Sequence, residues 1–126
     1  MGLSRAGRAL EMAETMMDHK LHDMMSLDMA RHLCRKLREN PLLLQRVQGQ
    51  LDYLETIERQ CKPEYRQAWI DAVGSGLEAT LALALDESER GQVLRSCSPM
   101  GVLWETPEER LEWITVWKKN HKGERK

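Results

Sequence analysis

The segment "LHDMMSLDMARHLCRKLRE", residues 21–39, decides the fold class. Along it an apolar side chain recurs at every fourth residue, at Leu21, Met25, Met29, Leu33 and Leu37. This period places the five side chains on one face of an α-helix. The rest of the chain has the same texture, because Phe is absent and Leu, Met, Ala, Glu and Arg dominate. Such a composition favours helix over sheet, so we predict an all-α fold.

Start and stop signals divide the chain into six to seven helices. Residues 4–18 form a first helix before residues 21–39, but nothing between the two breaks a helix, so one long helix over residues 5–37 is the alternative. Later helices begin at Asn40-Pro41, at Pro63, at Ser75 as an N-cap, within residues 86–97, and at Thr106-Pro107. We expect a single domain over residues 1–126. Its parts are an N-terminal helical hairpin or arm (1–60), a compact Trp-centred bundle (61–120) and a frayed basic tail (121–126).

Charge is balanced overall but uneven along the chain. The formal net charge is −1, which gives no field that selects nucleic acid or membrane. Residues 67–112 carry three basic against nine acidic side chains, a net of −6, whereas residues 113–126 carry five against one, a net of +4. No stretch approaches the ~20 apolar residues that span a bilayer, so we predict no membrane contact.

The three cysteines, Cys34, Cys61 and Cys97, are odd in number and far apart. They do not form the pattern of a disulfide framework, and no secretory signal precedes them. A reducing compartment fits this usage, and we predict a cytoplasmic protein.

The segment "RGQVLRSCSPMGVLWETPEER", residues 90–110, concentrates turn residues and apolar side chains. Pro99 forbids helix continuation and Gly101 permits unusual backbone dihedrals, so residues 97–105 form an elbow between two helices. The elbow is interpreted either as a cap on the core or as a docking edge. In the second case Trp104 is the anchor, because Trp is enriched at binding hot spots.

Six methionines lie between residues 12 and 29. Met is adaptable and common at binding surfaces, so we predict partner binding by Met16, Met17, Met24 and Met25, together with Trp104. The alternative is an ordinary core. A protein partner, such as a toxin-like enzyme, and a second copy of this chain are both candidate occupants.

A basic face follows the methionines, formed by Arg31, Arg35, Lys36 and Arg38. It is a candidate for phosphate or nucleic-acid contact, or for an acidic protein partner. The alternative is a solvated helix end, where cations favour the macrodipole.

The segment "DHKLHD", residues 18–23, is the candidate metal site. On a helix Asp18 and His22 are four residues apart, as are His19 and Asp23, and imidazole with carboxylate can chelate a divalent metal. A third and fourth ligand from elsewhere are lacking, so two solvated Asp–His pairs are the alternative. We predict no cofactor.

Motifs for nucleotide binding or nucleophilic catalysis are absent from the sequence. The segment "LRSCSPMGVLWETPEER", residues 94–110, resembles a pattern in short, uncharacterised, helical bacterial proteins, and "ENPLLLQRVQGQLDYL" upstream is similar to it. In those proteins Leu-Arg and Ser-Pro precede Val-Leu, and Pro-Glu-Glu-Arg opens a final helix. The resemblance implies a toxin–antitoxin or mobile-element neighbourhood and names no site.

We therefore predict a small cytosolic bacterial interaction module, an antitoxin-like neutraliser of a partner enzyme, and we favour a binding protein over an enzyme. Nucleic-acid binding through the basic face and a metal-dependent enzyme or sensor at residues 18–23 remain the alternatives.

Overall fold

The computed structural model describes the backbone of residues 5–57 and 61–121, and the side chains of that part from Lys20 onward. These residues form six α-helices and two 3₁₀ segments, with no strand among them, which confirms the all-α prediction. In chain order the elements are α1 (Arg5–Glu39), η1 (Pro41–Leu43), α2 (Leu44–Thr56), α3 (Pro63–Ser75), α4 (Leu77–Ala84), α5 (Glu89–Ser96), η2 (Pro99–Leu103) and α6 (Pro107–Asn120).

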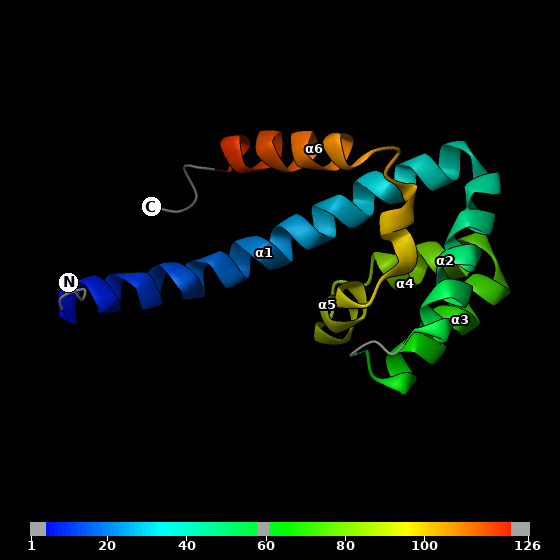
Figure 1. Cartoon of the computed structure of the whole chain (residues 1–126), viewed down its shortest axis with the longest axis horizontal. Coiled ribbons are helices and arrows are strands. Elements are labelled where there is room, and N and C mark those ends of the chain that lie inside the picture. The colour runs from blue at the N-terminus through cyan, green and yellow to red at the C-terminus, as the bar shows by residue number, and fades with distance from the viewer. Residues whose placement is uncertain (1–4, 58–60, 122–126) are drawn as a thin grey trace.

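The first helix, α1, is continuous over 35 residues, which makes it about 52 Å long at 1.5 Å per residue. The expected break between residues 18 and 21 does not occur, and the single-helix alternative is the one found. Figure 1 shows the N-terminal end of α1 reaching far from the cluster formed by α2 to α5. Among the side chains described on α1, from Lys20 onward, the fully buried ones are Ala30, Leu33, Cys34 and Leu37.

Most helix starts follow the sequence signals. Pro41, Pro63 and Pro107 each open a helical segment, and the Thr106 hydroxyl accepts a hydrogen bond from the Glu109 amide at 3.1 Å. The N-cap predicted at Ser75 is wrong by one residue. Ser75 ends α3 and donates to the Asp71 carbonyl at 2.8 Å, while Gly76 at φ 119° reverses the chain into α4. Only glycine adopts that dihedral without strain, so the cap falls on Gly76.

One core joins the two halves of the chain. It contains Leu33 and Leu37 of α1, Val47 and Leu51 of α2, and side chains from α3, α4, α5 and η2. Trp69 lies fully buried within it, and its indole N–H donates to the Leu94 carbonyl at 2.8 Å. The indole therefore fills the core and satisfies a backbone acceptor at once, as a Trp-centred bundle requires.

The expectation for residues 1–60 is a helical hairpin or an arm, and the described residues of α1 and α2 do not lie side by side as in a hairpin. Helix α1 packs against α4, α5 and η2 instead of lying along α2, and the two helices meet at a corner in Figure 1. The physical reason is the elbow, because η2 packs against α2 and also contacts α1. Pro99, Met100 and Leu103 of η2 are buried there. The elbow thus caps the core, which is the first of its two interpretations.

Candidate functional site

The long helix α1 and the last helix α6 face each other through a ladder of side chains. Three rungs run antiparallel: the Lys36 ammonium contacts the Glu109 carboxylate, the His32 ring lies 5.9 Å from the Trp113 ring, and the Trp117 indole N–H donates to Asp28 at 2.8 Å. Both rows have helical spacing, at residues 28, 32 and 36 and at 109, 113 and 117. Figure 1 shows α6 lying beside α1 on the side away from α2 to α5.

Trp104 stands at the inner edge of this ladder and is only 9 % exposed. Its ring stacks on His32 with centroids 5.3 Å apart, lies 6.0 Å from the Trp113 ring, and has the Lys36 ammonium 5.5 Å from its centroid. The predicted docking anchor therefore contacts its own chain on several sides. Its role in this structure is to hold η2, α1 and α6 together.

His32 carries the clearest electrostatic signature in the ladder. Burial lowers the pKa of its imidazole, and the neighbouring charges of Lys36 and Arg35 lower it further. The side chain is therefore biased toward the neutral ring that stacks on Trp104. The Glu109 carboxyl has a pKa lowered chiefly by its hydrogen bond to Lys36.

The basic face is largely engaged with acids of the same chain. Arg31 pairs with Asp28 at 3.1 Å and with Glu87 at 3.3 Å, and Arg38 pairs with Glu78 at 3.3 Å. Together with the Lys36–Glu109 pair, three of the four predicted nucleic-acid contacts thus meet carboxylates, all but one of them from the acidic stretch 67–112. Arg35 is exposed and forms no ion pair among the side chains described. The acidic stretch 67–112 therefore supplies ion-pair partners for the basic face within the same chain.

The predicted metal cluster is only partly within the described side chains. His22 and Asp23 are exposed on α1, while the side chains of Asp18 and His19 lie outside the described residues. Among the side chains that are described, no group of three or more His, Cys, Asp and Glu is placed to hold a metal ion. The metal site at residues 18–23 stays a prediction.

The predicted methionine surface begins where α1 leaves the core. Met24 is 41 % exposed and Met25 is half-buried, whereas the side chains of Met16 and Met17 lie outside the described part. Ala30 is the first fully buried residue among the described side chains of α1, and about 37 Å of helix precedes it. An exposed methionine therefore marks the base of a long helical projection.

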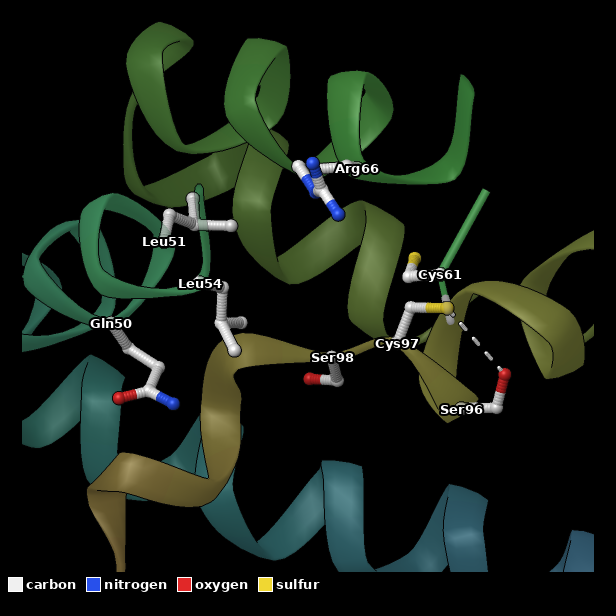
Figure 2. Close-up of a pocket in the computed structure, with 8 residues that line it drawn as sticks. All are labelled: Gln50, Leu51, Leu54, Cys61, Arg66, Ser96, Cys97 and Ser98. Carbon is white, nitrogen blue, oxygen red and sulfur yellow. Dashed lines mark hydrogen bonds between the residues drawn. The ribbon is translucent and has the colours of Figure 1, made fainter. Parts of the chain in front are cut away.

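A cysteine pair that the sequence did not predict lines a pocket of about 350 Å³. Cys61 comes from the segment before α3 and Cys97 caps the end of α5, and Figure 2 shows both thiols on the same side of the pocket. Arg66 of α3 lines the same space. The two cysteines are 36 positions apart and share no local motif, so only the fold reveals them as neighbours.

Arg95 is a buried cation with a structural task. Its guanidinium donates to the carbonyl of Ala84, the last residue of α4, at 3.3 Å and to that of Asp86, two residues later, at 2.5 Å. Its Nε is buried without a hydrogen-bond partner. Burial lowers the pKa of Arg95, and the nearby carboxylates of Asp86 and Asp23 act against that shift.

No protein-family model, curated protein or solved structure matches this chain. Among the described residues, no helix combines the length and the apolar character that crossing a bilayer requires.

Proposed function

We propose that this chain is a protein-interaction module that binds its partner through the projecting part of α1, in the manner of an antitoxin that neutralises an enzyme. The observation that carries the proposal is the contrast along α1. None of the described side chains from Lys20 to Met29 is fully buried, whereas fully buried side chains follow from Ala30 onward.

The projecting part of α1 gains little stability from its own backbone hydrogen bonds. Isolated helices are marginal in water, and most helical stability in proteins comes from packing an amphipathic face. The projecting part is therefore best stabilised by a surface that the folded body does not supply. A groove on a partner protein provides such a surface, with apolar side chains at helical spacing as anchors.

The methionines suit this mode of binding. Met24 is exposed at the base of the projection, and Met16 and Met17 precede Met24 and Met25 by about two helical turns in the sequence. Their unbranched side chains adapt to irregular grooves. The basic face is less suited to lead the contact, because Arg31, Lys36 and Arg38 are paired within the chain.

The test is to purify the chain from its native host at low salt and identify the bound protein by mass spectrometry. That protein is then produced separately and its affinity measured for the full chain and for a chain lacking residues 1–19. We expect the truncated chain to keep the helices of residues 20–121 and the unfolding midpoint, because Ala30 is the first fully buried residue among the described side chains of α1. We expect it to bind at least tenfold more weakly. Undiminished affinity of the truncated chain would contradict the proposal.

A matched pair of point variants sharpens the same test. Met24→Glu places a charge on the projection, and Tyr53→Glu places one at another exposed apolar residue, 56 % exposed on α2. We expect only Met24→Glu to weaken binding. Equal effects of the two variants would mean that the partner uses a different face. If the purified material has only the mass of a homo-oligomer of this chain, the partner is a second copy and not an enzyme.

A further inference from the structure

Cys61 and Cys97 belong to segments that leave the backbone some freedom. Cys61 lies outside any helix, just before α3, and Cys97 is the residue after the last turn of α5. Both thiols line the pocket formed with Arg66, Ser96 and Ser98, and Figure 2 draws the two sulfur atoms adjacent to each other. Neither thiol is buried in the core, so a small molecule can reach the pair.

The surroundings of Cys61 disfavour its thiolate. Burial, together with the hydrogen bond and charge of Cys97, raises the pKa of Cys61 to about 11, while Arg66 acts in the opposite direction. Cys61 therefore keeps its proton near neutral pH. Since the thiolate is the nucleophile in disulfide exchange, Cys61 suits the second, resolving step better than the first attack.

We propose that Cys61 and Cys97 form a reversible disulfide by exchange with a low-molecular-weight disulfide that carries carboxylates, of which glutathione disulfide is the probe. The Cys97 thiolate attacks one sulfur of the small disulfide, which forms a mixed disulfide and releases one small thiolate. Cys61 then loses its proton to solvent and attacks the Cys97 sulfur, which releases the second small thiolate. In sum, two protein thiols and one small disulfide give one protein disulfide and two small thiols.

Arg66 gives this pocket its preference among oxidants. Its guanidinium lines the same cavity as the two thiols and forms no ion pair among the described side chains. A permanent cation of this kind attracts a carboxylate-bearing disulfide and stabilises the thiolate that leaves. A neutral disulfide gains neither advantage.

The third cysteine supplies an internal control. Cys34 is 2 % exposed in the core of α1, and burial raises the pKa of its thiol to about 11. It is therefore both inaccessible and protonated, so it should take no part in the exchange. The disulfide would instead close the chain from residue 61 to residue 97 and tie the start of α3 to the end of α5, which restricts the unfolded state.

The experiment treats the folded full-length chain with glutathione disulfide, blocks free thiols by alkylation and maps the peptides by mass spectrometry. We expect one free thiol, at Cys34, and a Cys61–Cys97 linked peptide that dithiothreitol removes. Cys34→Ala should form the same link. Cys61→Ser should stop at the mixed disulfide on Cys97, with folding checked by circular dichroism, and Arg66→Gln should react more slowly with glutathione disulfide but not with neutral hydroxyethyl disulfide.

The proposal is overturned if the folded chain keeps three free thiols, or if Cys34 enters the link, or if only disulfides between separate chains form. A crosslink that forms equally fast in the chain unfolded with urea would also overturn it, because the fold would then have no part in pairing the thiols.

Discussion

The two parts of α1 on either side of Ala30 have similar sequences and different surroundings. Upstream, Leu21, Met25 and Met29 continue the fourth-residue stripe but are only half-buried. Downstream, Leu33 and Leu37 of the same stripe are buried in the core, where α1 packs against α4, α5 and η2. The stripe is continuous, whereas the surface that covers it is not. An amphipathic pattern therefore shows which face of a helix is apolar, but the rest of the fold decides how far along the helix that face is covered.

The largest expected effect comes from removing an anchor of the covered part. Leu37 is 0 % exposed, so Leu37→Ala should lower the free energy of unfolding by about 2–5 kcal/mol, through lost burial and the cavity that remains. Met24→Ala on the same helix should change it by less than about 0.5 kcal/mol. Urea denaturation followed by circular dichroism measures both. Similar losses for the two variants would show that α1 is packed as tightly around Met24 as around Leu37.

A smaller effect separates the paired and unpaired cations of the basic face. Lys36 donates to the Leu103 carbonyl at 3.4 Å and lies over the Trp104 ring, so Lys36→Ala should cost about 1 kcal/mol from those two contacts. Arg35→Ala, at an exposed position one residue away, should have an effect close to zero. Thermal unfolding at low and at high salt distinguishes them. If Arg35→Ala costs as much as Lys36→Ala, the side-chain ladder does not hold α1 to α6.

The smallest effect is a dependence of stability on pH. The pKa of His32 in the folded chain lies below its usual value of 6.5, so between these two values the unfolded chain binds more protons. Stability should therefore be greatest above pH 6.5 and fall as the pH drops below it. The lowered pKa of Glu109 adds a second loss below 4.5, its usual value. His32→Gln should abolish the first loss and keep the second, as measured by urea midpoints from pH 8 to pH 4; an unchanged profile would contradict this.

The sequence predicted the secondary structure well because the signals are local. Proline at positions 41, 63 and 107 and the cap at Thr106 act on the adjacent backbone, and each opens a helical segment where expected. The N-cap predicted at Ser75 was wrong because Gly76, one residue later, allows a sharper reversal of the chain, and the direction of α4 depends on tertiary packing. The sequence also left open whether α1 is one helix or two, because no helix-breaking residue lies between residues 18 and 21.

The contacts between distant segments were less predictable. The sequence left two interpretations of the elbow around Trp104, and only its burial in the structure separates them. For the basic face, neither the predicted phosphate contact nor the solvated alternative included the carboxylates of Glu78, Glu87 and Glu109. One signal was present in the sequence. Residues 28, 32 and 36 and residues 109, 113 and 117 have the same spacing with complementary chemistry, which is what an antiparallel pair of helices requires.

The sequence by itself determined the helices, the absence of a strand pattern and the uneven distribution of charge, because each follows from neighbouring residues or from composition. The tertiary structure alone decided which cations are paired, where the cover on α1 stops, and that Cys61 meets Cys97. The pairs Cys61–Cys97, Arg38–Glu78, Arg31–Glu87 and Lys36–Glu109 join residues 36 to 73 positions apart. No local energy term relates residues at such separations until packing brings them together.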